Sequence, residues 1–202
     1  MSSASEPHIA AIVLAAGGGS RLGESKPLAE VGGETLLERV VGRVTDALGA
    51  APIAVLGSGW PEIVERCRGR LPYYAINEGW RDGQSTSLAT GLRAVPPDCD
   101  AVLIVLVDQP LILAAHYREL IAAARERPDA VIATAFDGVQ GVPVVLPRRL
   151  FAQANNLDGD TGARPLLAEA GDAVIAVPCA EAAIDIDTPE ELARLRSLKQ
   201  PE

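Results

Sequence analysis

The sequence predicts a three-layer α/β/α domain built around a mixed, mostly parallel sheet. Short runs that are apolar throughout alternate along the chain with longer stretches in which apolar residues recur every three or four positions. The short runs are typical of strands that are buried on both faces, as strands between two helical layers must be. Strands that alternate with helices favour right-handed crossovers and this layered class.

Five apolar runs account for the predicted parallel strands. They lie at residues 9–15, 53–56, 101–107, 131–135 and 174–177. Two short candidates, residues 72–76 and 142–146, are interpreted as edge or antiparallel members of the same sheet.

Helical periodicity is clearest in residues 36–48 and 117–124, where apolar residues lie three and four positions apart. The last predicted helix, residues 189–198, opens at a capping box with proline at the first helical position. Thr188 and Glu191 are the two partners of that box. The spacing therefore fixes where this helix begins.

Length and composition agree with one domain over residues 1–202. Residues 1–8 are expected to be a disordered N-terminus and residues 199–202 a tail, and no Pro- or Ser-rich linker divides the chain. The polar start lacks the basic region of a signal peptide, and the longest apolar runs are too short to span a bilayer. These observations predict a cytoplasmic protein.

The formal net charge of −9 argues against nucleic acid and anionic membranes as partners. The three cysteines, Cys67, Cys99 and Cys179, lack the spacing of a metal site and are interpreted as reduced thiols. If the substrates are polyanions, so acidic a chain needs local cations and a divalent metal to hold them.

The most informative segment is the loop that follows the first predicted strand. Its glycines can take positive φ and offer backbone N–H groups to phosphate oxygens, while Arg21 and Lys26 can neutralise phosphate charge. The chain has only two lysines, Lys26 and Lys199, so a lysine in this loop favours a role for its compact ammonium group. The glycines are Gly17, Gly18, Gly19 and Gly23.

Two well-known phosphate loops do not fit this segment. In a Walker A loop a lysine directly follows the second glycine, whereas Gly23 is followed by Glu24 and Ser25. A dinucleotide loop needs a third small residue where Leu22 stands. It also needs an acidic residue at the end of the following strand, and no acidic residue ends a strand near position 37. The spacing alone indicates a phosphate or nucleotide site, and a glycine-rich turn with incidental charges is the alternative.

Three carboxylates are candidates for metal binding. Asp108 directly follows the most apolar run, where it could hold Mg²⁺ or cap the next turn. Asp185 and Asp187 are separated by one residue, so on an extended chain both side chains point the same way. Asp185 is favoured as the second metal ligand, and Asp187 could instead support the start of the last helix.

Motifs along most of the chain together resemble one family. The first comprises Leu14, Ala15, Ala16, Gly17, Ser20, Arg21, Leu22, Gly23, Lys26, Pro27 and Leu28. The later ones are Asn77-Glu78-Gly79-Trp80 with Gly83, Ser85, Ser87 and Gly91, then Asp108-Gln109-Pro110-Leu111, Gly141-Val142-Pro143-Val144, Gly159-Asp160-Thr161-Gly162-Ala163-Arg164 and Asp185-Ile186-Asp187-Thr188-Pro189-Glu190. Over about residues 9–196 the chain resembles the GT-A-like nucleotidyltransferases, which have a Rossmann-like fold, and specifically the molybdenum cofactor cytidylyltransferase group.

The resemblance implies a reaction. CMP would pass from CTP to the terminal phosphate of molybdopterin, or of its molybdenum-loaded form, with release of pyrophosphate. The implied metal is Mg²⁺, with Mn²⁺ as the alternative, and a transient contact with a recipient molybdenum hydroxylase is also implied.

The resemblance also implies which residues take part. Arg21, Lys26 and Asp108 are the implied catalytic residues, with Asp108 and Asp185 as metal ligands. The residues implied for nucleotide binding are Leu14, Ala15, Ala16, Gly17, Gly18, Gly19, Ser20, Asn77, Gly83, Ser85 and Ser87. Those implied for acceptor binding are Gln109, Gly141, Pro143, Asp160 and Arg164.

Alternatives to this substrate assignment stay open. The pair Ala15-Ala16 resembles the cytidylyl branch, whereas the guanylyl branch, which uses GTP, tends to have Gly at the second position. Val142 departs from the family, in which a polar residue often precedes the proline. A cytidylyltransferase of the isoprenoid or sugar-phosphate pathways and a non-catalytic molybdenum cofactor carrier are the other candidates.

Four further side chains have an ordinary structural interpretation. Ser85 or Ser87 could cap a helix expected over residues 88–94. His8 and His116 have no acidic or serine partner at the spacing of a catalytic triad, so both are interpreted as surface or cap residues.

Overall fold

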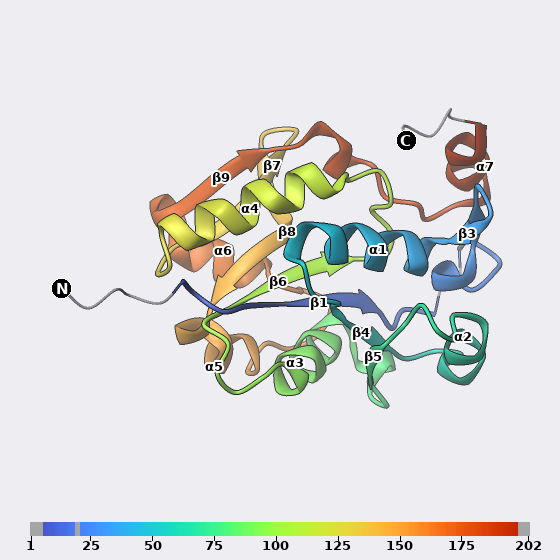
Figure 1. The fold of residues 1–202 in the computed structure, drawn as a ribbon, viewed down its shortest axis with the longest axis horizontal. Coiled ribbons are helices and arrows are strands. Elements are labelled where there is room, and N and C mark those ends of the chain that lie inside the picture. Colours follow the sequence, from blue (N-terminus) through green and yellow to red (C-terminus); the bar gives the residue numbers. More distant parts are fainter. Residues whose placement is uncertain (1–5, 19–20, 198–202) are drawn as a thin grey trace.

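A seven-stranded mixed sheet forms the middle layer of the structure (Figure 1). The computed structural model describes residues 6–18 and 21–197. The strand order across the sheet is β5-β4-β1-β6-β8-β7-β9. The strands are β1 (Ile9–Ala15), β4 (Ile53–Leu56), β5 (Tyr73–Ile76), β6 (Ala101–Leu106), β7 (Val131–Phe136), β8 (Val139–Pro147) and β9 (Val174–Pro178), with β2 (Glu30–Val31) and β3 (Glu34–Thr35) forming a separate pair.

Within this sheet β8 runs antiparallel to both of its neighbours, β6 and β7, whereas the other neighbouring strands are parallel. The prediction of a mostly parallel mixed sheet is confirmed, with β5 at one edge and β8 as the antiparallel member. β8 spans nine residues and is longer than predicted. The turn that precedes it, Asp137-Gly138, has positive φ at both residues (46° and 76°), as a tight hairpin requires.

Helices cover both faces of the sheet. Figure 1 shows α1 (Leu36–Leu48) and α4 (Ala114–Glu126) side by side on one face, and their buried residues form one core cluster with the sheet. A second cluster lies on the other face, beneath α3 (Gln84–Ala94), α5 (Phe151–Ala154) and α6 (Arg164–Ala170). The remaining helices are α2 (Trp60–Arg66) and α7 (Pro189–Ser197) and the short 3₁₀ turns η1 (Lys26–Leu28), η2 (Trp80–Asp82), η3 (Arg148–Leu150), η4 (Gly171–Ala173) and η5 (Ala180–Ala183).

Local sequence sets the ends of α1 and α7. Thr35 Oγ1 accepts the N–H of Glu38 at 3.1 Å, and Glu38 Oε2 accepts the N–H of Thr35 at 2.9 Å, which completes a capping box. Gly49 ends α1 with φ 75°. At α7 the N–H of Thr188 donates to Glu191 Oε2 at 2.9 Å and the N–H of Glu191 donates to Thr188 Oγ1 at 3.3 Å, so the predicted capping box is present.

The core lies on both sides of β1. Val13 packs into the cluster under α1 and Ile12 into the cluster under α3, because successive strand residues face opposite layers, and both are fully buried. A Cβ added to Gly91 of α3 would lie 2.7 Å from Ile12 Cδ1. Glycine at this position therefore lets α3 lie directly on β1.

The sequence interpretation of His116 as a surface or cap residue is wrong. His116 lies in the first turn of α4, which begins at Ala114. It belongs to the buried side of this helix together with Tyr117, and it is only 7% exposed. Its Nε2 lies 2.9 Å from Thr134 Oγ1 of β7. Burial lowers the pKa of His116, although the charges of Glu119 and Glu181 partly offset this effect.

Of the predicted termini, residues 1–5 and the tail 199–202 lie outside the described residues, as does residue 198, the predicted end of the last helix. Residues 6–8 are described, and the N–H of His8 donates to Asp100 Oδ2 at 2.8 Å.

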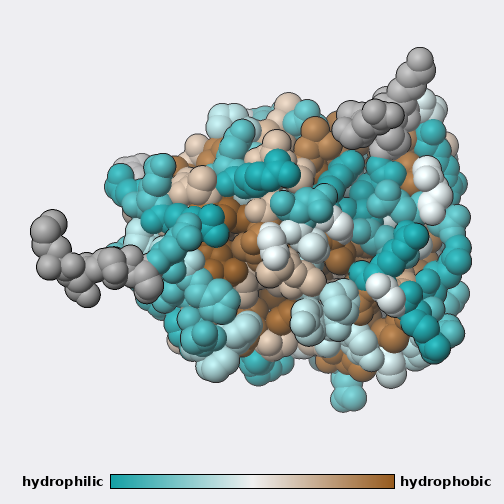
Figure 2. Space-filling view, viewed as in Figure 1, coloured by the Kyte–Doolittle hydropathy of each residue, from teal (hydrophilic) through white to brown (hydrophobic). Residues whose placement is uncertain are grey.

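The face drawn in Figure 2 is hydrophilic over much of its area, with apolar residues gathered toward its middle. In the described part of the chain, no helix has both the length and the apolar character to cross a bilayer.

Candidate active site

The glycine loop leaves the sheet at the carboxyl end of β1. Ala16 is buried and its carbonyl accepts the N–H of Ser58 at 3.2 Å, which ties the loop start to the loop after β4. Of the described loop glycines, Gly23 takes positive φ (77°), as predicted, whereas Gly17 and Gly18 do not. Gly19 and Ser20, both predicted to bind nucleotide, lie outside the described residues.

Lys26 joins the loop to two carboxylates. Its Nζ donates to Asp108 Oδ2 at 3.1 Å and to Asp187 Oδ1 at 2.6 Å, and Arg21 donates to Asp187 Oδ2 at 3.0 Å. The Lys26 side chain is 14% exposed and the Arg21 side chain 75% exposed. The structure thus brings a mostly buried cation, Lys26, and an exposed cation, Arg21, to one acidic site.

The charges of this site set its pKa values. Burial alone would lower the pKa of Lys26, but the charges and hydrogen bonds of Asp108 and Asp187 outweigh it and raise that pKa. The hydrogen bond from Lys26 lowers the pKa of Asp187, since it overcomes a smaller effect of burial. Lys26 is therefore cationic and Asp187 anionic at neutral pH.

Backbone contacts hold Asp108 beside the segment that carries Asp187. The N–H of Ile186 donates to the carbonyl of Asp108 at 2.8 Å, so residues far apart in sequence meet at the end of β6. Arg43 of α1 donates to the carbonyls of Pro110 and Ile112, the latter at 2.9 Å. These bonds fix the loop that follows Asp108.

Asp108 offers one carboxylate oxygen that fits a divalent cation. Its Oδ2 accepts from Lys26, but its Oδ1 is buried and has no hydrogen-bond partner. A buried carboxylate oxygen without a donor is costly unless another positive group satisfies it, and Mg²⁺ and Mn²⁺ prefer such oxygen ligands. Within the described residues, no group of three or more His, Cys, Asp or Glu side chains is placed to hold a metal alone.

Asp185 and Asp187 line different clefts. Asp185 is exposed overall, yet desolvation and the charge of Asp108 raise the pKa of its carboxyl. A hydrogen bond from Gln109 acts in the opposite direction. The two carboxylates therefore reach different surroundings, and the assignment of Asp185 as the second metal ligand stays a prediction.

A cleft of about 410 Å³ opens between the glycine loop and the start of α3. It is lined by Leu14, Ala15, Ala16, Gly17, Arg21, Lys26, Pro27, Trp80, Gly83, Gln84, Ser87, Leu106, Val107, Asp108, Asp160 and Asp187. We call it the nucleotide cleft. Most of the residues predicted to bind nucleotide, and all three predicted catalytic residues, lie on its walls.

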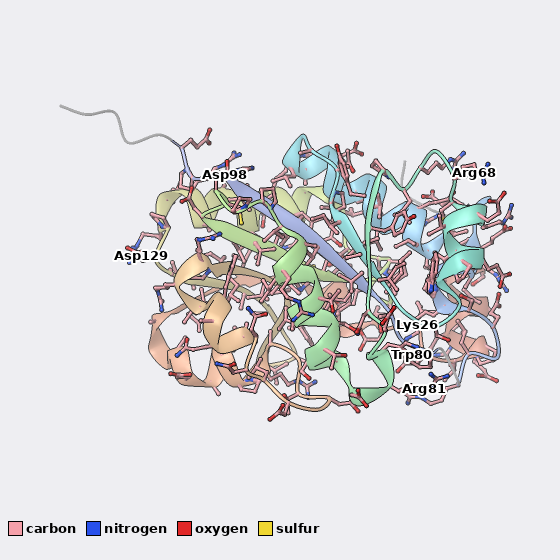
Figure 3. The ribbon with its side chains drawn as sticks, turned by 90° about the horizontal axis from the view of Figure 1, so that it is seen from below. Lys26, Arg68, Trp80, Arg81, Asp98 and Asp129 are labelled. Carbon is pink, nitrogen blue, oxygen red and sulfur yellow. The ribbon has the colours of Figure 1, made fainter. Side chains whose placement is uncertain are left out.

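Trp80 forms one wall of the nucleotide cleft. Figure 3 shows Trp80 and Lys26 at the same end of the molecule, far from Asp98 and Asp129. A Cβ at Gly18 would lie 3.1 Å from the Trp80 ring, and a Cβ at Gly57 would lie 2.7 Å from Trp80 Cβ. Glycine at both positions lets the indole lie against the loop, and the guanidinium of Arg81 lies 4.3 Å from the ring centroid.

Asn77 and Ser85, predicted to bind nucleotide, stand behind the cleft wall instead of on it. Asn77 is 3% exposed, and its Nδ2 donates to Thr86 Oγ1 and Ser87 Oγ, both at 2.9 Å. Its Oδ1 accepts the N–H of Gly79 at 3.1 Å. Asn77 therefore braces the first turn of α3, from which Ser87 reaches the cleft.

The prediction that a serine caps α3 is wrong. The helix begins at Gln84 and not at residue 88, so Ser85 and Ser87 lie inside it. Gly83 precedes it with φ 112°, and the N–H of Gln84 donates to Asp160 Oδ1 at 3.1 Å. The N–H of Ser85 donates to the carbonyl of Gly159 at 3.1 Å. A loop that lies about seventy-five residues later in the chain, rather than a local serine, satisfies the first donors of α3.

A second cleft of about 930 Å³ continues from the first and shares Gln84, Leu106 and Asp160 with it. Its other lining residues are Gln109, Phe136, Gly138, Val139, Gln140, Gly141, Val142, Thr161, Gly162, Ala163, Arg164, Leu167, Ala168, Gly171 and Asp185. We call it the second cleft. Four of the five residues predicted to bind acceptor line it, whereas Pro143 is buried behind it.

Six residues that line the nucleotide cleft have no predicted binding or catalytic role: Pro27, Trp80, Gln84, Leu106, Val107 and Asp187. Trp80 and Gln84 lie within the same polar stretch as Gly83, so their neighbours were a usable signal. The Asp187 carboxylate pairs with Lys26, a role that the Asp-x-Asp spacing alone cannot distinguish from support of α7.

Comparison with known proteins identifies the family. Residues 11–174 match the MobA-like NTP transferase domain, and the chain belongs to this family. It is 28% identical over 200 residues to nicotine blue oxidoreductase of Paenarthrobacter nicotinovorans, covering 94% of this chain and 97% of that protein. It is 29% identical over 210 residues, with the same coverages, to the purine catabolism protein PucB of Bacillus subtilis. A probable molybdenum cofactor guanylyltransferase of Opitutus terrae is 29% identical over 157 residues, covering 75% and 73%.

Solved structures agree with this membership. A nucleotidyl transferase from Methanothermobacter thermautotroptrophicus is 25% identical, with a TM-score of 0.80 and coverage of 94% of this chain and 96% of that one. The manganese complex of Rv0371C from Mycobacterium tuberculosis has a TM-score of 0.80 at 22% identity, covering 96% and 100%, which shows the fold. The chain is a nucleotidyltransferase of the MobA-like family.

Proposed function

We propose that this nucleotidyltransferase transfers CMP from CTP to the terminal phosphate of molybdopterin, or of its molybdenum-loaded form, and releases pyrophosphate. The observation that carries the proposal is Lys26 Nζ, which lies between Asp108 and Asp187 beside the glycine loop, with a second cleft adjoining the first. One cleft suits a nucleoside triphosphate and the other a second, larger substrate.

The reaction needs no protein nucleophile. The acceptor phosphate is anionic at neutral pH and attacks the α-phosphorus of CTP, a phosphoanhydride bond forms, and the bond to the β-phosphate breaks as pyrophosphate leaves. Lys26 and Arg21 neutralise the triphosphate, and loop N–H groups donate to its oxygens. Catalysis then depends on the orientation of two bound anions and on charge neutralisation.

A divalent metal fits the acidic side of this site. Asp108 would hold it through the buried Oδ1, and we propose Asp185 as the second ligand. When bound, Mg²⁺ or Mn²⁺ would neutralise phosphate charge during the transfer. The manganese-bound relative of the same fold is consistent with this proposal.

The base preference rests on Ala16. This residue lines the nucleotide cleft, and its methyl occupies space that glycine would leave open, next to Gly57 and Trp80. A pyrimidine needs less room against this wall than a purine does. We therefore propose CTP over GTP, although a relative is named a guanylyltransferase.

The acceptor is proposed for the second cleft, where Arg164 can meet an anion and Phe136 offers an aromatic surface. A molybdenum hydroxylase that receives the product is the proposed transient partner. The names of the relatives span nucleotidyl transfer, purine catabolism and an oxidoreductase, so the acceptor has to be tested directly.

The test is pyrophosphate release from CTP and from GTP, each with and without purified molybdopterin, in Mg²⁺ and in Mn²⁺. Release from CTP that depends on molybdopterin, with a CMP-containing product by mass spectrometry, supports the proposal. Equal or faster release from GTP moves the enzyme to the guanylyl branch. Release with an isoprenoid or sugar phosphate, but not with molybdopterin, rejects the acceptor.

A further inference from the structure

β8 forms one wall of the second cleft, and its pairing with the neighbouring strands is interrupted beside that cleft. Thr134 of β7 pairs with Gly141, whereas the preceding pair in the ladder involves Val144, so Val142 and Pro143 have no partner residue in β7. On its other side β8 pairs with β6 only as far as Val144. The irregular segment therefore lies where β8 enters the cleft wall.

A buried side chain replaces the missing ladder bond. Thr134 has no exposed surface, and its Oγ1 donates to the carbonyl of Pro143 at 2.7 Å. His116 Nε2 lies 2.9 Å from the same Oγ1. Because the hydroxyl proton is used on the carbonyl, Oγ1 accepts from His116, which assigns the imidazole proton to Nε2.

His116 and Thr134 can affect the second cleft only through the backbone of β8. Neither His116 nor Thr134 lines the second cleft, but Gly141 and Val142 both do. The Phe136 ring closes the other side of Gly141, where a Cβ would lie 3.2 Å from the ring. The backbone between these contacts is thus held from behind by one hydroxyl, which is itself oriented by one imidazole.

We propose that His116 and Thr134 are positioning residues for the acceptor, and that they act by fixing the Gly141-Val142 wall of the second cleft. The inference rests on the proposed function for the identity of the acceptor. The pairing of the two side chains does not depend on that identity. No side chain of the pair touches substrate, so the effect must appear in acceptor binding and not in nucleotide binding.

The kinetic test compares Thr134→Val with Thr134→Ser. Valine keeps the shape and loses the hydroxyl, so KM for molybdopterin should rise about tenfold, as expected for one unsatisfied buried carbonyl, while KM for CTP stays unchanged. Serine keeps the hydroxyl and should restore KM for molybdopterin to within about twofold of wild type. Equal values for the two variants would overturn the inference.

A matched control separates positioning from general loss of stability. Thr35 is 2% exposed and its hydroxyl caps α1, far in sequence from the second cleft. Thr35→Val should lower thermal stability without changing KM for molybdopterin. A rise in that KM as large as for Thr134→Val would show that buried threonines act only on stability, and would overturn the inference.

Hydrogen exchange of the full chain without substrate separates the inference from the proposed function. Thr134→Val should speed amide exchange in residues 139–147 at least tenfold over wild type and Thr134→Ser, with residues 9–15 unchanged. If Thr134→Val does not fold, His116→Phe should give the same local increase. Unchanged exchange in the folded variant rejects the inference. A wild-type enzyme inactive toward molybdopterin, but with the local exchange effect, rejects the acceptor assignment and leaves the positioning pair supported.

Discussion

The two clefts are built from different kinds of local structure. Most residues of the nucleotide cleft lie at the carboxyl ends of the parallel strands β1 and β6 or in the loops that follow them, and the others come from the region that opens α3 and from Asp160 and Asp187. The second cleft uses the antiparallel strand β8, the start of α6 and a loop near Gly159. A parallel strand delivers the residues that follow it to a known edge of the sheet, whereas an antiparallel strand forms a wall only through its register.

Their electrostatics differ as well. Lys26 and Arg21 are already paired with carboxylates in the nucleotide cleft. Arg164 is exposed, and no ion pair of its side chain is recorded in the described part of the chain. The first cleft thus combines cations with acids, as a metal and a triphosphate require together, while the second offers a free cation beside apolar side chains.

The sharpest test of the acidic side of the nucleotide cleft is Asp108→Asn. The amide keeps the shape but loses the charge, so turnover should fall at least about 10³-fold while the fold is retained. The measurements are kcat over a range of Mg²⁺ concentrations and the thermal midpoint. Asp129→Asn, an exposed change at the other end of the molecule (Figure 3), is the control, and normal turnover at saturating Mg²⁺ by the Asp108 variant would exclude the metal role.

The cations should matter next. Lys26→Ala and Arg21→Ala should each lower kcat by about 10²- to 10³-fold, the usual effect of removing one preorganised donor to the transition state. Arg68→Ala is the matched control for Arg21, because its side chain is similarly exposed (78% against 75%) and also pairs with a carboxylate. If either variant changed only thermal stability, its residue would have a structural role.

The second cleft should respond differently. Arg164→Ala should raise KM for molybdopterin about tenfold with little change in kcat or in KM for CTP, because a cation that contacts the acceptor in ground and transition states contributes uniform binding. The competing role is a surface cation worth under about 1 kcal/mol to stability. Steady-state kinetics with each substrate varied in turn decides: two unchanged KM values would remove Arg164 from the acceptor site.

The same contrast explains what could be predicted from sequence. β1 and α1 are predicted correctly because an apolar run and a helical period are local patterns. The start of α3 is missed because its first donor bonds to Asp160, a contact that no local pattern encodes. The length of β8 is missed because only its second half is apolar, although Asp137-Gly138 is a hairpin signal in the sequence.

The candidate site residues show the same difference between local patterns and long-range contacts. Arg21, Lys26 and Asp108 are predicted and do meet, since each follows a strand end. Pro143 is predicted to bind acceptor but lies behind the wall, because the register of β8 decides which residues face the cleft. His116 of α4 is buried beside Thr134 of β7. A lone histidine in a helical pattern gives no signal of this contact, because its partner lies in a different element.

The smallest expected effect concerns the pH dependence of stability. Because burial lowers the pKa of His116 in the folded protein, the unfolded chain binds a proton at this residue more readily. Its contribution to the free energy of unfolding is therefore fully present above the ordinary pKa of about 6.5, and it declines as the pH falls below that value toward the folded pKa. The variant His116→Phe lacks the titrating group, so its stability should fall less than that of wild type between pH 7 and pH 5.

Denaturant unfolding of both proteins across this range measures the difference, and the exposed change His8→Phe is the control. The His8 side chain is half exposed and lies 3.5 Å from Asp98, so this variant also removes one histidine but leaves the buried contact of His116 with Thr134 in place. The hydrogen bond between His116 and Thr134 needs a proton on His116 Nε2, and both the neutral Nε2–H tautomer and the charged imidazole carry one. Parallel pH profiles for wild type and His116→Phe would mean that protonation of His116 costs the folded state nothing, and would contradict a pKa lowered by burial.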